Sequence, residues 1–79
     1  MLAERTQDWG DPVHTHRRIA ETWTAILGSR VTPTEVALCM AALKLVRASI
    51  AEVGPGMQDS LIDAAAYVRI VEMLQQEES

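Results

Sequence analysis

Apolar residues recur every three or four positions in three stretches of the chain, which is the spacing of helices with a buried face. The sequence shows no strand-like alternation of apolar and polar residues. The pattern therefore predicts an all-α protein with a three-helix protomer, in a single small domain over residues 1–79. The expected helices span residues 12–27, 33–53 and 59–75.

Residues that favour helix ends flank these stretches. Asp11, followed by a proline, is typical of a helix N-terminus, because Asp caps free N–H groups and proline suits the first helical position. Thr32 and Glu35 fit a capping box around the second start. The Gly-Pro-Gly segment 54–56 predicts the break before the third helix. We expect residues 76–79 to form a frayed polar tail.

The second and third helices are more apolar than a lone surface helix. Among residues 36–46 only Lys44 is polar, and residues 61–74 carry only three charges. A helix that is apolar on all sides is buried on all sides, and three helices cannot cover two of their own number. We therefore predict a homo-oligomer, a dimer or higher, in which these helices form an antiparallel helical bundle. A compact monomer with an exposed apolar patch is the alternative.

Composition limits the function further. A chain of 79 residues has a thin core, and its single cysteine, Cys39, excludes an internal disulfide. The net charge of −4 argues against nucleic acid as a partner, since domains that bind it are usually basic. No apolar run approaches the length of a membrane span, and the N-terminus lacks a signal-peptide core. We expect a cytoplasmic protein with neither nucleic acid nor membrane as partner.

Polar residues interrupt the apolar helices at regular spacing. Asp59, Asp63 and Tyr67 are four residues apart and share one side of the third helix. Lys44, with Arg47 three residues on, lies among alanines of the second helix. The simplest assembly places these two rows against each other. The rows then form either a Lys44–Asp63 ion pair that fixes the register of the helices or a polar pocket between them.

In such a pocket, Lys44 and Arg47 are suited to hold phosphate, and Asp59 with Asp63 to bind Mg²⁺. His14 and His16 are a poor zinc pair, because two helical residues two positions apart point about 200° from each other. We expect His16 to be a core or pocket residue.

Several motifs resemble those of a family of small phage and prophage proteins of unknown function. Members of that family show Tyr-Gly-Asp-Pro, Lys-Leu-x-Arg and Asp-Ser-x-x-Asp-x-x-x-Tyr patterns. The resemblance covers residues 8–74 of this chain. The matching segments are Trp9-Gly10-Asp11-Pro12, Lys44-Leu45-Val46-Arg47, and Asp59-Ser60 with Asp63 and Tyr67.

The layout of that family is similar to MazG-like nucleotide pyrophosphohydrolases, helical oligomers that bind Mg²⁺ through acidic helix motifs and hydrolyse nucleoside triphosphates. The resemblance implies that Asp59 and Asp63 match the second acidic motif. Lys44 and Arg47 stand where the first acidic motif would carry two glutamates. The resemblance thus implies a nucleotide ligand and leaves catalysis open.

Two functions are compatible with these residues. In the first, the protein binds a nucleotide or another phosphorylated ligand between its helices, with Trp9 stacking on a base and Asp11 closing the site. In the alternative, it is a non-enzymatic homodimeric interaction protein that binds a host protein through its first helix. On that helix we expect Arg17 or Arg18 to pair with Glu21.

Overall fold

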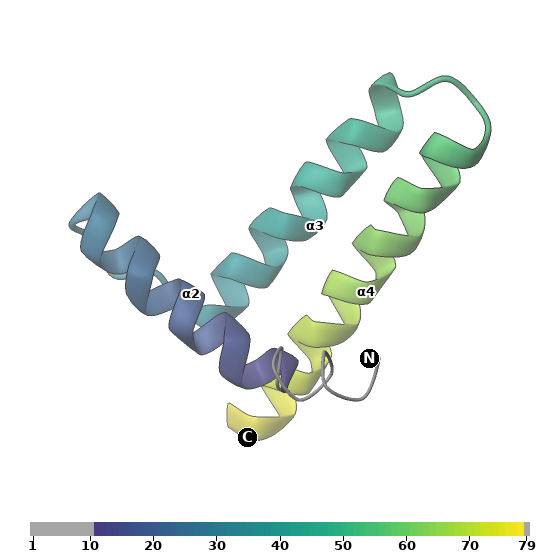
Figure 1. Cartoon of the computed structure of the whole chain (residues 1–79). Coiled ribbons are helices and arrows are strands. Elements are labelled where there is room, and N and C mark those ends of the chain that lie inside the picture. The colour runs from purple at the N-terminus through teal and green to yellow at the C-terminus, as the bar shows by residue number, and fades with distance from the viewer. Residues whose placement is uncertain (1–10, 79) are drawn as a thin grey trace, which may run out of the picture.

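A computed structural model describes residues 11–78, and this part of the chain is all-α (Figure 1). Three helices follow one another within it, and it contains no strand. The predicted fold class is thereby confirmed, whereas the oligomeric bundle stays a prediction. The helices are α2 (Pro12–Leu27), α3 (Pro33–Ile50) and α4 (Pro55–Glu78).

The bounds of α2 agree with the prediction from sequence, and both ends are capped as expected. The Asp11 carboxylate accepts a hydrogen bond from the Val13 N–H at 3.0 Å. At the other end Gly28 adopts a left-handed conformation, with φ of 73°, and its N–H donates to the Thr24 carbonyl. A residue with a side chain would be strained in this conformation, which is why glycine ends the helix.

The capping box at the start of α3 is complete. The Glu35 N–H donates to Thr32 Oγ1 at 3.1 Å, and the Thr32 N–H donates to Glu35 Oε1 at 2.8 Å. The hydrogen bond from the Thr32 N–H to the Glu35 carboxylate holds the pKa of Glu35 below its ordinary value, because it favours the charged form, and the Thr32 side chain acts in the same direction.

The break between α3 and α4 differs from the prediction. α3 ends at Ile50 rather than at residue 53, because Ala51 already has extended backbone angles. Gly54 has a φ of 146°, and the chain re-enters a helix at Pro55, where the Gln58 N–H donates to the Gly54 carbonyl at 3.0 Å. The proline that was expected to separate the helices is the first residue of α4, a position that suits it.

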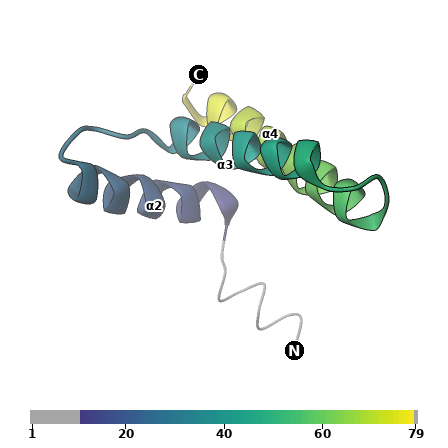
Figure 2. The same ribbon diagram turned by 90° about the horizontal axis from the view of Figure 1, so that it is seen from above.

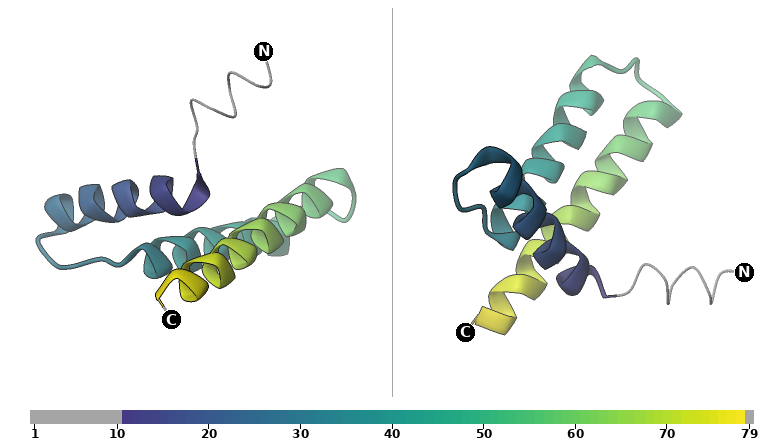
Figure 3. Two further views of the ribbon diagram at one scale, coloured as in Figure 1. Left: turned by 90° about the horizontal axis from the view of Figure 1, so that it is seen from below. Right: turned by 60° about the vertical axis from the view of Figure 1, so that its left-hand side comes forward.

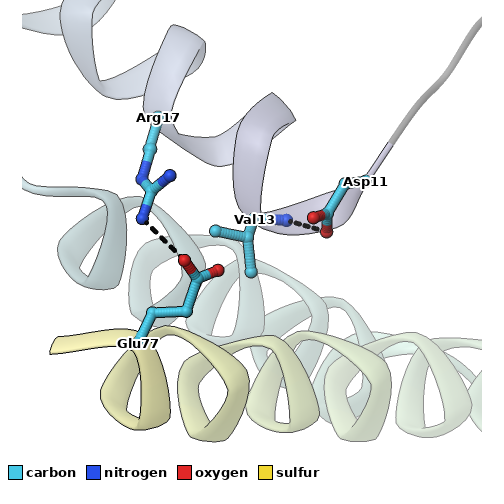
Figure 4. Close-up of polar contacts among 4 residues, drawn as sticks. All are labelled: Asp11, Val13, Arg17 and Glu77. Carbon is cyan, nitrogen blue, oxygen red and sulfur yellow. Dashed lines mark hydrogen bonds and ion pairs between the residues drawn. The ribbon is translucent and has the colours of Figure 1, made fainter. Parts of the chain in front are cut away.

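The C-terminal end of α4 also corrects the prediction of a frayed tail. The helix continues to Glu78 instead of ending at residue 75. An ion pair of 3.1 Å joins Arg17 on α2 to Glu77, so the last turn of α4 has a tertiary contact (Figure 4). The sequence predicted that Arg17 or Arg18 pairs with Glu21 on the same helix, whereas the structure pairs Arg17 with Glu77, 60 residues away.

α3 and α4 run side by side in opposite directions and are joined by a short turn (Figure 1). α2 crosses one face of this hairpin near the start of α3 and the end of α4 (Figures 2 and 3). The contact centres on Val13, Ala37 and Leu74, one residue from each helix, which are 2%, 0% and 1% exposed.

The core of the described residues is small and rich in alanine. Its buried apolar residues are Val13, Ala20, Val36, Ala37, Ala41, Ala48, Ala64 and Leu74. Many larger apolar side chains of α3 and α4 remain exposed, including those of Leu38, Leu45 and Ile62. No helix in residues 11–78 is both long and apolar enough to cross a membrane.

The variant Thr32→Ala is expected to lower the free energy of unfolding by about 1 kcal/mol at neutral pH, because the N-terminus of α3 loses its cap. The folded state lowers the pKa of Glu35, so the stabilising effect of its charge is present above the ordinary glutamate pKa. That effect is lost as the pH falls through the lower pKa of the folded protein. Urea unfolding of Thr32→Ala and of the parent at pH 7 and pH 3 measures both effects.

Glu35→Gln is the control, because glutamine keeps an acceptor for the Thr32 N–H but has no charge to titrate. In the Glu35→Gln protein, the loss of unfolding free energy caused by Thr32→Ala should therefore be the same at pH 3 and pH 7. A Thr32→Ala effect in the parent that is equally large at pH 3 and pH 7 would contradict the role given to the charged carboxylate.

Candidate functional site

The ion pair predicted between the two polar rows is present. Lys44 Nζ lies 3.1 Å from Asp63 Oδ2, which joins the middle of α3 to the middle of α4. The lysine side chain is 21% exposed and the aspartate side chain 51% exposed. Lys44 reaches its position because neighbouring residues on its side of α3 are alanines, such as Ala41 and Ala48, and both are buried. The pair is therefore half open to solvent, and its carboxylate remains accessible.

Arg47 and Asp59 lie near this ion pair on the same two helices. Arg47 is one turn from Lys44 on α3, and Asp59 is one turn from Asp63 on α4. Both side chains are exposed, and neither forms an ion pair or side-chain hydrogen bond with any residue that the structure describes. The Arg47 guanidinium is thus available for a bidentate contact with an anion.

The row of polar residues on α4 continues to Tyr67 and from there to α2. Tyr67 is half-buried, one turn beyond Asp63. Its ring meets the ring of His16 edge to face, with centroids 6.0 Å apart and planes at 61°. Two aromatic rings therefore lie at one end of the row, and Arg47 lies at the other.

His16 is a buried residue with an unsatisfied nitrogen. The residue is 5% exposed, and its Nδ1 lies 2.9 Å from the Pro12 carbonyl oxygen. That oxygen can only accept, so Nδ1 is the donor, and in the tautomer with one ring hydrogen Nε2 is an acceptor. Nε2 is buried and has no hydrogen-bond partner among the described residues. Such a group costs free energy unless a donor reaches it.

The structure describes one of the two N-terminal residues predicted for the site, Asp11, but not the other, Trp9. The Asp11 carboxylate caps α2 through Val13, so at least one of its oxygens has a structural role (Figure 4). Trp9 lies outside the described residues.

The acidic residues do not form a self-contained metal site. No group of three or more His, Cys, Asp or Glu side chains gathers into a metal-binding cluster in residues 11–78. Asp63 already has Lys44 as a partner, which leaves Asp59 as the uncommitted carboxylate of the predicted pair. A divalent cation here would need oxygen ligands from a bound phosphate or from water.

Sequence reasoning missed a groove between α2 and the segment that enters α3. It has a volume of about 560 Å³, and none of the predicted site residues line it. Arg17, Glu21 and Arg30 bring charges to it, over a floor that includes Ala20 and Val31. Periodicity could not find this groove because the turn that forms it depends on Thr24, whose hydroxyl bonds both the N–H and the carbonyl of Val31.

Comparison with known proteins places the chain in a family. A family model described as "Domain of unknown function (DUF6378)" matches residues 1–75. The chain belongs to this family. The gene 55 protein of Mycobacterium phage L5 is 40% identical to it over 73 residues. That alignment covers 91% of this chain and 45% of the phage protein, so the chain spans less than half the length of this relative. No solved structure matches the chain.

Membership of DUF6378 and the phage relative confirm the resemblance to phage proteins of unknown function. The similarity to MazG-like enzymes stays a prediction. The description of the family assigns no activity, so the site residues of this DUF6378 chain have to be interpreted from their own geometry.

Proposed function

We propose that this DUF6378 protein binds a phosphorylated small molecule, a nucleotide foremost, along the polar row between α3 and α4. The observation that carries the proposal is Arg47, a guanidinium without a described partner, one turn from the half-open Lys44–Asp63 ion pair. An arginine and a lysine at this spacing suit the oxygens of a phosphate, and a bound phosphate would give Lys44 a second anionic partner.

The other end of the row suits the base of a nucleotide. Tyr67 is level with the helix turn that precedes Lys44, so the aromatic end and Arg47 are roughly 10 Å apart along the helix axis. The half-buried ring of Tyr67 offers stacking surface, and His16 Nε2, which has no partner among the described residues, is an acceptor for a donor that reaches it. An amino group or ring N–H of a base is a donor of the required kind.

The described residues of the site offer binding groups but no constellation for hydrolysis. Lys44 already forms an ion pair with Asp63, one of the two carboxylates. The described residues provide no metal cluster to activate water. We therefore propose a binder, with Mg²⁺ entering as a companion of the ligand phosphates.

A thermal-shift screen tests this proposal with inorganic phosphate, pyrophosphate, and nucleoside mono-, di- and triphosphates, each with and without Mg²⁺. A ligand at about 100 times its Kd adds about 2.7 kcal/mol, which raises the Tm of so small a domain by several degrees or more. Lys44→Met should abolish this shift while the Tm of the free protein changes little, because the Asp63 side chain that loses its partner is 51% exposed and stays hydrated.

Arg69→Met is the matched control. Arg69 also forms an ion pair, with Glu72 at 3.6 Å, but both side chains are exposed and lie on another side of α4. The ligand shift should survive in this variant. A screen without any shift, or an equal shift in Lys44→Met and the parent, would overturn the proposal.

The competing function is a homodimeric interaction protein that binds a host protein without chemistry. The exposed apolar side chains of α3 and α4 favour it, because a small-ligand site does not require them. A flat ligand screen combined with capture of a defined host protein by the parent, but not by a variant of the exposed α2 face such as Arg18→Glu, would favour this function.

A further inference from the structure

One side of the α3–α4 hairpin carries mainly apolar residues in the spacing of a helical bundle, with a polar residue at one end of each row. On α3, positions 34, 38, 41, 45 and 48 alternate in steps of four and three residues. On α4, positions 57, 61, 64, 68, 71 and 75 do the same. This heptad spacing is what packed helices show along their contact seam. We call the side formed by these positions the heptad face.

The heptad positions of both helices lie on the same side of the hairpin. Gln75 Nε2 donates to Thr34 Oγ1 at 3.4 Å, which brings the first α3 position and the last α4 position together. α3 and α4 are antiparallel (Figure 1). From this contact toward the turn, each later heptad position of α3 therefore lies beside an earlier heptad position of α4.

This face points away from α2. Glu77, which contacts α2 through Arg17, is two residues from Gln75, and two helical residues are about 200° apart. The heptad face and the face that α2 covers are therefore on different sides of one two-helix layer. Figure 2 shows that α2 lies along one side of this layer.

Four large side chains of the heptad face are largely uncovered, whereas Val71, near the end of the face, packs against the core cluster. Leu38, Leu45, Leu61 and Val68 are 45–52% exposed, and between them the small residues Ala41, Ala48 and Ala64 are buried. The face thus consists of aliphatic ridges beside shallow alanine positions, a shape that accepts the ridges of another helix pair.

We infer that a second copy of this chain covers the heptad face, so that two hairpins form a four-helix bundle with α2 on the outside of each. Four-helix bundles need two hairpins, and one chain supplies one. The inference does not depend on a ligand at the polar row.

The absence of charged residues from the heptad face favours a second copy of the chain as its binding partner. The chain carries a net charge of −4, so two copies repel each other unless the contact itself is free of charge. Every heptad position is apolar or uncharged, whereas the row that contains Lys44 and Asp63 belongs to the seam between the helices and the face beside α2. Two identical heptad faces can meet without bringing like charges together.

The area of the heptad face and the small core of the chain also favour a dimer. The 18 residues of α3 are about 27 Å long, and two helices are roughly 20 Å wide, so the face measures roughly 500 Å² in outline. Stable interfaces bury about 800 Å² of corrugated surface per partner, which is the same scale. The alanine-rich core buries few large side chains, so covering the heptad face would add stability, and a second copy is present wherever the first is made.

Sedimentation equilibrium of the unchanged protein tests this inference, with an expected mass of twice the 8.7 kDa of one chain. Leu45→Glu should raise the dimer Kd by roughly 100-fold or more, because a two-fold interface buries the unpaired charge twice. Val46→Glu is the control: its residue is adjacent on α3 and 59% exposed but about 100° away from the heptad face, and the dimer should persist.

If Leu45→Glu does not fold, the unchanged protein still decides the matter. The Tm of a dimer that folds as it associates rises with protein concentration, so a tenfold dilution should lower it. A parent that is monomeric and has the same Tm at all concentrations would overturn the inference and leave the face to another protein. Dissociation by Val46→Glu but not by Leu45→Glu would place the contact elsewhere and would also overturn it.

Discussion

Leu74→Ala is expected to lower the free energy of unfolding by about 2–5 kcal/mol, the range for removing a fully buried leucine side chain. Leu74 is 1% exposed and packs against Val13 of α2 and Ala37 of α3, so its side chain joins all three helices. A domain of this size has roughly 3–5 kcal/mol of stability from its own core. The variant should therefore be largely unfolded at 37 °C, which circular dichroism and urea unfolding measure.

Leu27→Ala is the matched control for this prediction. The same atoms are removed, but Leu27 is 66% exposed at the end of α2. Substitutions at exposed positions usually change stability by less than about 0.5 kcal/mol. Equal losses in the two variants would show that Leu74 is not the centre of the core.

Ala37→Leu is expected to destabilise the protein by about 1–3 kcal/mol through overpacking. Ala37 is 0% exposed and contacts the core cluster where α2 crosses the hairpin. A larger side chain has no space there and should push α2 away from α3. Urea unfolding measures the loss, and increased hydrogen exchange of the α2 amides would locate it.

The double variant Ala37→Leu with Leu74→Ala adds a test of the contact itself. Because the two residues belong to one cluster, the added leucine can fill part of the cavity left by the other. The double variant should lose less stability than the two single losses combined. Ala25→Leu, at an exposed position of α2, should be nearly neutral. Additive losses in the double variant would contradict direct packing between these positions.

The two proposals assign different roles to the different sides of the hairpin. The seam between α3 and α4 carries Lys44, Arg47 and Asp63 and leads through Tyr67 to His16, and we propose that it binds a phosphorylated ligand. The heptad face is mainly apolar and carries no charge, and we propose that it binds a second copy. Their tests are independent, because Lys44→Met should leave the dimer intact and Leu45→Glu changes no residue of the polar row.

Helix starts were predictable because they depend on neighbouring residues. Asp11 and the Thr32–Glu35 capping box act within four residues of their positions, and both are present as expected. The start of α4 was misplaced because Gly-Pro is compatible with both a helix break and a helix start. The backbone angles of Ala51 and Gly54 decide between them, and these belong to the turn as a whole.

The candidate site was partly predictable for the same kind of reason. Spacing placed Lys44 in the small-residue row of one helix and Asp63 in the polar row of the next, and an antiparallel hairpin brings such rows together. The pairing of Arg17 with Glu77 was not predictable, since it depends on the angle at which α2 crosses the hairpin. The same angle buries His16 and leaves its Nε2 without a described partner.

The sequence by itself determined the all-α class, the three helices and the surplus of apolar surface, because periodicity and capping are local properties of the chain. Only the tertiary structure decided which apolar residues are covered. One layer of two helices and a crossing helix can bury a single side of the hairpin, so Val36 and Leu74 lie inside while Leu38 and Leu45 remain exposed. That choice is set by the direction in which α2 packs, and no residue pattern within a single helix encodes it.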